Sequence, residues 1–211
     1  MILVLASGLA AGLLHCVTGP DHVAALAPFS VEAHRRAWVV GMRWGIGHAA
    51  GIVAVAVVAA VAADGLDLRV FTAAGDYLVG GVLVAVGLWG LWHGRRGAHA
   101  HGAAAHASHV HTTAALSIGT LHGLVGTGST LAVLPTLGLH TLAERALYLS
   151  GFALGTVATM SGIAWLLGVL APRDELGSAY RHAFTLASLA SLALGSVWLG
   201  LALAGVDLHA G

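Results

Sequence analysis

Residues 146–170 read ALYLSGFALGTVATMSGIAWLLGVL and contain no charged side chain. An α-helix rises about 1.5 Å per residue, so about 20 apolar residues cross the hydrocarbon core of a bilayer. The stretch therefore predicts a transmembrane helix. The rest of the chain fits this setting, because 58% of its 211 residues are hydrophobic and only 9% are charged. Soluble domains are about a quarter charged.

Five further apolar stretches predict an all-α polytopic membrane protein with about six transmembrane helices. The predicted helices cover residues 2–27, 37–63, 77–93, 114–139, 146–170 and 183–206. We interpret the first stretch as a retained helix, because it lacks the basic start and the small-residue cleavage site of a secretory signal. The lipid bilayer is therefore an expected partner.

The distribution of arginine predicts the orientation of the chain in the membrane. The segments after the first, third and fifth helices hold Arg35, Arg36, Arg95, Arg96, Arg173 and Arg181, and the opposite side holds Arg69 and Arg145. This asymmetry places the arginine-rich segments in the cytoplasm and both termini outside. A formal net charge of zero predicts no nucleic-acid partner.

The two halves of the chain resemble each other. The sequence His15-Cys-Val-Thr-Gly is similar to His122-Gly-Leu-Val-Gly, and Pro28 and Pro135 are separated by the same distance along the chain. A three-helix unit that is repeated once must insert in opposite orientations. We predict two inverted three-helix repeats, at residues 1–93 and 114–211, joined by a His-rich cytoplasmic loop at residues 94–113.

The first predicted helix carries a group of polar residues at membrane depth. His15 and His22 are two helical turns apart and share a face, and Asp21 is adjacent to it. A carboxylate inside a membrane is costly and marks a functional site. Pro20 removes a backbone donor and Gly19 makes a break easier, so the helix should kink or break here. A broken helix can lend free carbonyl groups to ion coordination.

Two further histidines lie inside apolar stretches, His48 in the second helix and His122 in the fourth. Each needs a polar partner, because an unpaired polar group in an apolar environment costs several kcal/mol. We therefore predict one shared metal-binding centre made of His15, Asp21, His22, His48 and His122. Imidazole and carboxylate together suit nickel, cobalt, zinc or copper better than magnesium or calcium. For His48 or His122 taken alone, an interhelical hydrogen bond is an equally good explanation.

The predicted loop is rich in histidine. The loop contains His99, His101, His106, His109 and His111, and His93 directly precedes it. The composition is typical of a flexible linker that binds metal weakly, and a soluble spacer without a specific role is the alternative.

These motifs together resemble the nickel/cobalt transporter superfamily, and within it the six-helix UreH-like permeases of urease maturation. The resemblance rests on His15-Cys-Val-Thr-Gly-Pro-Asp21-His22, on Gly45-Ile-Gly-His48 and on His122-Gly-Leu-Val-Gly. It implies secondary transport of nickel, or of cobalt, through the predicted centre, with uptake favoured over export. It further implies a bacterial cytoplasmic membrane, no enzymatic activity, no resident cofactor, and urease or hydrogenase maturation proteins as partners.

Three other functions are compatible with the same residues. A metal exporter of the same fold is the nearest one. A membrane b-type cytochrome would use histidine pairs as axial haem ligands, although Asp21 beside His22 argues against a haem pocket. A protein that assists metalloenzyme maturation without transport is the third.

Overall fold

The computed structural model describes residues 1–61, 68–96, 104–125, 132, 135–136, 138–172 and 177–205. In these ranges the chain is all-α, and it contains no strand. Its helices are α1 (Ile2–Thr18), α2 (Pro20–Ala33), the short 3₁₀ helix η1 (His34–Arg36), α3 (Ala37–Val61), α4 (Leu68–Arg96), α5 (Ala104–Val125), α7 (Leu142–Leu170) and α8 (Ser178–Leu203). The fold class predicted from composition is thus confirmed at the level of an all-α chain.

Four helical stretches in the described part of the chain are long and apolar enough to cross a membrane. They are Pro20–Val58, Gly75–Gly94, Leu142–Leu170 and Ser178–Leu203. The helix α1 is apolar as well, but it is shorter, with 17 residues. Its end at Thr18 divides the predicted first span of residues 2–27 into two helices.

The predicted boundaries differ most around the middle of the chain. The helix α5 ends at Val125, whereas the sequence predicted a helix over residues 114–139. It begins at Ala104 and α4 continues to Arg96, so much of the predicted loop at residues 94–113 is helical. Alanine is the strongest helix former, and the many alanines of this segment favour a helix despite its polarity. The intervening residues 97–103 are outside the described part.

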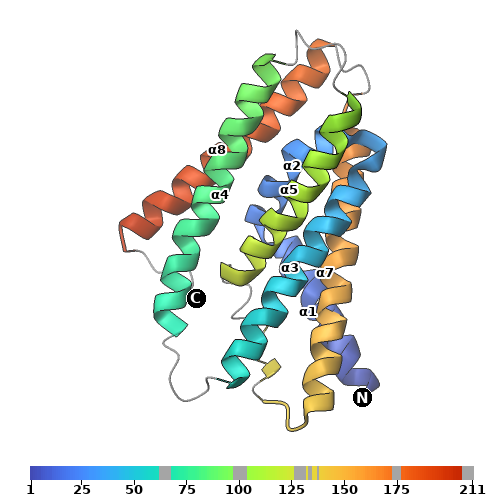
Figure 1. Ribbon diagram of the computed structural model, residues 1–211, viewed down its shortest axis with the longest axis vertical. Helices are drawn as coiled ribbons and strands as arrows, with labels where there is room; N and C mark the ends of the chain where they lie inside the picture. Colours follow the sequence, from blue (N-terminus) through green and yellow to red (C-terminus); the bar gives the residue numbers. More distant parts are fainter. Residues whose placement is uncertain are drawn as a thin grey trace.

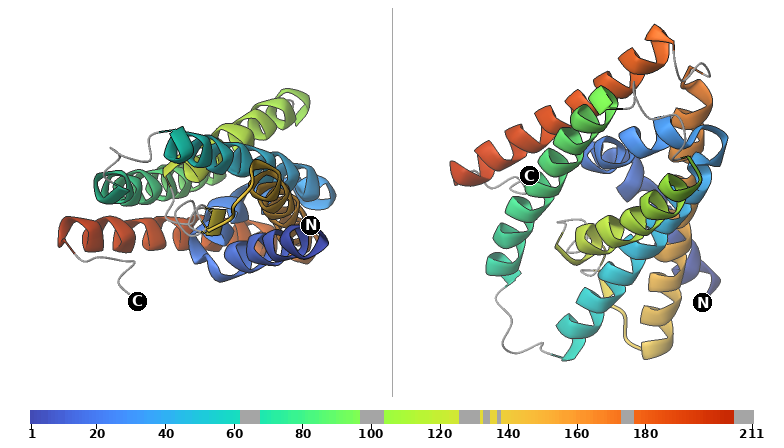
Figure 2. Two further views of the ribbon diagram at one scale, coloured as in Figure 1. Left: turned by 90° about the horizontal axis from the view of Figure 1, so that it is seen from below. Right: turned by 45° about the horizontal axis from the view of Figure 1, so that its top comes forward.

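The helices pack in pairs: α1 lies against α7, α3 against α5 and α4 against α8, and α3 also packs against α7. In Figure 1 the pair α4 and α8 lies to one side of the molecule, and α1, α3, α5 and α7 form the other part. The two views of Figure 2 show the same division.

Glycines bring the paired backbones close together. A Cβ atom at Gly8 or Gly12 of α1 would collide with the carbonyl oxygens of Tyr148 and Phe152 in α7. A Cβ atom at Gly119 of α5 would collide in the same way with the carbonyl of Trp44 in α3. Small residues at such positions are the usual device for packing helices in a membrane.

Two acidic residues near predicted helix starts have different structural roles. Glu144 forms a capping box with Thr141 at the start of α7, as expected for an acid in a first helical turn. Asp76 instead lies inside α4, where it is buried and accepts a hydrogen bond from the Trp198 indole at 3.3 Å. The predicted helix over residues 77–93 begins just after Asp76, because the apolar run starts there, whereas α4 itself begins at Leu68.

Candidate metal centre

The predicted metal centre lies at the break between α1 and α2. Gly19 is extended, with φ −86° and ψ 100°, and Pro20 occupies the first turn of α2, where its missing N–H is not needed. The Thr18 hydroxyl donates to the Leu14 carbonyl at 2.9 Å and the Gly19 N–H donates to the His15 carbonyl at 3.2 Å. These carbonyls therefore have donors from the chain itself, and the centre is made by side chains.

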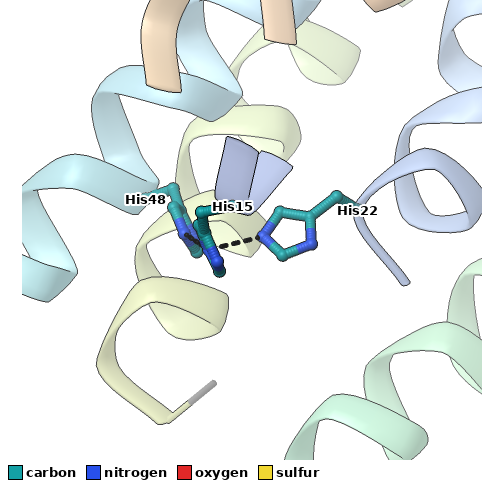
Figure 3. A group of neighbouring side chains, drawn as sticks. All are labelled: His15, His22 and His48. Carbon is teal, nitrogen blue, oxygen red and sulfur yellow. Dashed lines mark hydrogen bonds between the residues drawn. The ribbon is translucent and has the colours of Figure 1, made fainter. Parts of the chain in front are cut away.

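Three imidazole rings from α1, α2 and α3 meet at this break (Figure 3). The Nε2 atom of His15 lies 3.1 Å from the Nε2 atom of His22 and 3.2 Å from the Nε2 atom of His48. The possible ligand atoms of these three residues all lie within 4.8 Å of one another. The His15 and His48 rings are stacked, and the His22 ring stands edge-on to both.

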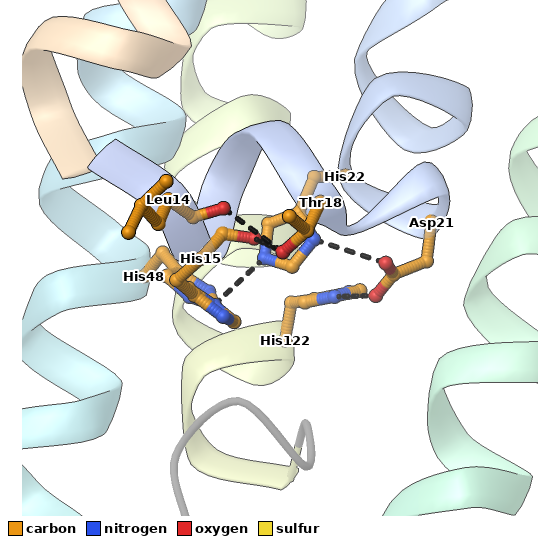
Figure 4. Close-up of polar contacts among 7 residues, drawn as sticks. All are labelled: Leu14, His15, Thr18, Asp21, His22, His48 and His122. Atoms are coloured by element: carbon orange, nitrogen blue, oxygen red, sulfur yellow. Dashed lines mark hydrogen bonds and ion pairs between the residues drawn. The ribbon is translucent and has the colours of Figure 1, made fainter. Parts of the chain in front are cut away.

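A carboxylate lies behind these rings (Figure 4). Asp21 Oδ1 lies 3.0 Å from His22 Nδ1, and Asp21 Oδ2 lies 2.7 Å from His122 Nε2. An ionised carboxylate only accepts hydrogen bonds, so both of these nitrogens carry the proton and donate. His22 is thereby held in the tautomer whose Nε2 has a free lone pair, and that atom is the one that faces His15.

Apolar and aromatic groups cover most of the centre, and His15 is its half-buried member. His22, His48 and His122 each expose 3% of their surface or less, and Asp21 is buried as well. The buried indole of Trp44 stacks on His48 with ring centroids 4.9 Å apart, and Phe152 lies 5.6 Å from the His15 ring. Polar groups buried this deeply are stable only when their hydrogen-bonding capacity is met.

The hydrogen-bonding capacity of these rings is not fully met by protein groups. The Nε2 atom of His15 carries one lone pair or one proton, so it cannot make two good hydrogen bonds to two facing nitrogens. The buried Nδ1 atoms of His48 and His122 have no hydrogen-bond partner among the described residues. A cation among the three Nε2 atoms would satisfy the lone pairs that converge there.

All five residues predicted from sequence come together, but they do so in two groups that share His22. His15, His22 and His48 form one group, and Asp21, His22 and His122 form the other. His122 therefore stands behind Asp21 and does not face the three Nε2 atoms. The sequence reasoning did not assign a role to Trp44, although its indole precedes His48 by one helical turn.

The His-rich segment is only partly described. His99 and His101 lie outside the described residues, and the side chains of His106, His109 and His111 do as well. His93 is described, and its Nε2 atom lies 3.3 Å from Glu32 Oε1. Weak metal binding by this segment stays a prediction.

The fold and this centre define a class: an all-α protein with helices apolar enough to cross a membrane and a cluster of histidines and one aspartate between them. The chain is 31% identical over 172 residues to the Chloroplast protein FOR GROWTH AND FERTILITY 2 of Arabidopsis thaliana, which covers 77% of this chain and 46% of that protein. It is 40% identical over 86 residues to the Chloroplast protein FOR GROWTH AND FERTILITY 1 of the same plant, which covers 40% of this chain and 24% of that protein. The chain thus spans less than half the length of these curated relatives. No family model and no solved structure matches it.

These relatives correct the resemblance to nickel/cobalt transporters. Both are named as plant chloroplast proteins, not as bacterial metal permeases. The expected membership of the UreH-like permeases, the transport of nickel or cobalt and the bacterial cytoplasmic membrane are therefore wrong. The physical reason is that a short His-Asp-His motif on a broken helix indicates only which ions could be bound there. The motif does not show to which family a protein belongs or whether it transports the bound ion. The maturation partners were implied by the same resemblance and stay a prediction.

Proposed function

We propose that this protein binds one divalent first-row transition-metal ion inside the membrane, with His15, His22 and His48 as its ligands. The observation that carries the proposal is the convergence of three imidazole Nε2 atoms, two from buried rings and one from the half-buried His15. Imidazole nitrogen suits zinc, copper, nickel and iron, so the proposal names this group of metals. Binding is the proposed role, and no catalysed reaction is assigned to the centre.

The spacing of the nitrogens supports a shared ion. Two imidazole nitrogens that bind one ion at about 2.0–2.1 Å in tetrahedral geometry lie about 3.3 Å apart. The observed separations from His15 Nε2 are 3.1 Å and 3.2 Å, so the rings need to move only slightly. Three protein ligands also leave one coordination position for water or another small ligand.

Asp21 and His122 have a supporting role in this proposal. Metal-binding histidines usually donate their second ring N–H to a carboxylate or a carbonyl, which fixes the ring and makes it a stronger ligand. The bond between His22 Nδ1 and Asp21 Oδ1 has this arrangement. The bond from His122 then holds the second oxygen of the same carboxylate. A negative carboxylate next to the site also offsets part of the charge of the ion.

The finer architecture that we propose is about six transmembrane helices in two inverted repeats. The paired glycine contacts support it. Gly12 packs on Phe152 and Gly155 packs on Leu9, whereas the other half pairs Gly119 with Trp44 and Gly47 with Leu116. The two sets of contacts interchange when α1 is aligned with α5 at an offset of 107 residues, which also aligns His15 with His122, and α3 is aligned with α7 at an offset of 108. An experimental structure whose halves do not superpose about an axis in the membrane plane would contradict the repeat.

The names of the relatives support a chloroplast membrane as the setting of this protein. That setting is proposed from similarity alone, since the matched regions are only part of each relative.

Metal binding is tested directly on the purified protein in detergent. Equilibrium dialysis against zinc, copper, nickel, cobalt and manganese, followed by elemental analysis, gives the stoichiometry and the Kd for each. We expect about one ion per chain, with manganese the weakest because its usual ligands are oxygens. The variants His22→Ala and His48→Ala should lose more than the 10–100-fold in affinity that supporting residues contribute.

His182→Ala is the matched control, because His182 is exposed near the start of α8. It removes one imidazole without touching the centre and should bind like the unchanged protein. Helical content measured by circular dichroism shows whether each variant is folded. Equal affinity in folded His22→Ala, His48→Ala and His182→Ala proteins would refute the proposal.

A further inference from the structure

A second polar site lies at the end of the molecule where α2 ends and α3 begins. A cavity of about 400 Å³ is lined there by residues 32–36, which end α2 and form η1, and by Gly168 and Val169 near the end of α7. The cavity is separate from the metal centre and shares none of its residues.

The side chains of the cavity carry a net positive charge. Arg35 and Arg36 are both exposed, and each is permanently charged. Glu32 is the single acid of the lining, and its carboxylate is paired with His93 at 3.3 Å. The lining therefore holds two arginines and one carboxylate, which already has a partner. Arginine is the side chain best suited to bind phosphate, because its planar fork donates two parallel hydrogen bonds.

The backbone of the cavity wall is strained. His34 has φ 47° and ψ −121°, a conformation outside the usual regions for a residue with a side chain. Its N–H donates to the Ser30 carbonyl, and its ring packs on Tyr180 at 5.5 Å. A Cβ atom at Gly168 would collide with the His34 carbonyl, so glycine is needed at this position. Strained residues that their surroundings hold in place are concentrated at binding sites.

Three exposed tryptophans fix the depth of the cavity in the membrane. Trp38, Trp92 and Trp165 expose 47%, 52% and 51% of their surface. Trp38 is in the first turn of α3, and the other two lie four and five residues before the ends of α4 and α7. Exposed tryptophan is enriched where the hydrocarbon core meets the lipid headgroups. The helix ends around the cavity therefore lie at headgroup level.

From the charge, the strained wall and the depth, we propose that this cavity binds the phosphate headgroup of an anionic lipid through Arg35 and Arg36. A headgroup at this level reaches the cavity without leaving the bilayer. Soluble phosphate offers the same anion but gains nothing from the neighbouring tryptophans and apolar helix surface. The lipid is therefore the occupant to which the proposal commits.

The test measures lipid binding to the full chain, and it uses no metal. Native mass spectrometry of the protein in detergent, titrated with phosphatidylglycerol or phosphatidylcholine, gives the Kd for each lipid. We expect phosphatidylglycerol to bind at least tenfold more tightly. In the double variant Arg35→Gln, Arg36→Gln this preference should fall by roughly 10–30-fold, because each arginine near an anionic surface contributes about a factor of five.

Arg181→Gln is the matched control, because Arg181 is an exposed arginine in the first turn of α8 and does not line the cavity. It should keep the full preference. A separate arm adds inorganic phosphate at millimolar concentration, which should not displace the lipid. The proposal is overturned if both lipids bind equally, if phosphate displaces the lipid, or if Arg181→Gln loses as much preference as the double variant. Unchanged helical content in every variant confirms that a loss of binding is not a loss of folding.

Discussion

Replacing Gly19 by alanine tests how the centre is assembled, because this glycine touches the ligands without being one. A Cβ atom here would collide with His22 Nδ1 and lie 2.8 Å from Asp21 Oδ1. The backbone itself would accept alanine, since φ −86° is open to every residue. The effect of Gly19→Ala is therefore purely steric, and it falls on the hydrogen bond between His22 and Asp21.

The expected size follows from that bond. The two side chains must move apart, and their 3.0 Å contact cannot survive a displacement of the ring nitrogen away from the new methyl group. Loss of a supporting carboxylate from a metal-binding histidine costs 10–100-fold in affinity. We therefore expect the Kd for the preferred metal to rise by this factor, which corresponds to about 1.4–2.8 kcal/mol.

A competition titration against a coloured chelator measures this Kd in detergent. Gly162→Ala is the control, because Gly162 lies on α7 and a Cβ atom there would meet nothing within 4 Å. It should bind metal normally and gain up to about 1 kcal/mol in helix stability. If Gly19→Ala binds as tightly as Gly162→Ala, then the hydrogen bond from His22 to Asp21 does not support a metal ligand, and our account of the centre is wrong.

The same account makes three further predictions. His122→Ala should weaken metal binding by 10–100-fold and still bind one ion, whereas His48→Ala should bind metal far more weakly. If equilibrium dialysis shows a larger loss for His122→Ala than for His48→Ala, then His122 is the ligand and His48 the supporting residue. Metal affinity should fall once the pH is low enough to protonate the ligand imidazoles, by up to tenfold per pH unit for each proton that the ion displaces, because imidazole binds metal only when it is neutral; burial disfavours the charged form of each ring, so a steep loss of affinity already between pH 7 and 6 would argue against this buried site. Thr141→Ala removes the capping box with Glu144 and should lower the free energy of unfolding by about 1 kcal/mol without changing metal affinity, as measured by denaturant titration in detergent.

Much of the centre could be predicted from the sequence because its residues violate the rule of an apolar membrane interior. His15, Asp21 and His22 lie close together in one apolar segment of the sequence, and the Gly19-Pro20 pair predicts the break between α1 and α2. Division of the five residues into two groups could not be predicted. It depends on which oxygen of Asp21 faces which ring, and so on how α2 is rotated against its neighbours.

Helix boundaries were harder to predict, for a different reason. A run of apolar residues indicates only the part of a helix that lies in the hydrocarbon core. The helix itself can continue beyond that run, because backbone hydrogen bonds do not require apolar side chains. The helix α4 therefore begins at Leu68, well before the predicted residue 77, and takes Asp76 into its interior. The partner of Asp76 is Trp198 on α8, a contact between distant segments that no local pattern contains.

The pairing of the glycine-rich helices also determines the order in which the protein can mature. Of the described helices α1 is synthesised first, but its Gly8 and Gly12 face is covered by α7, which the ribosome completes after every other described helix except α8. Until then α1 is a helix of 17 residues, about 26 Å long, in a hydrocarbon layer of about 30 Å. A chain truncated before Leu142 would leave α1 without its packing partner. The helix α1 therefore reaches its final packing only after α7 has been synthesised.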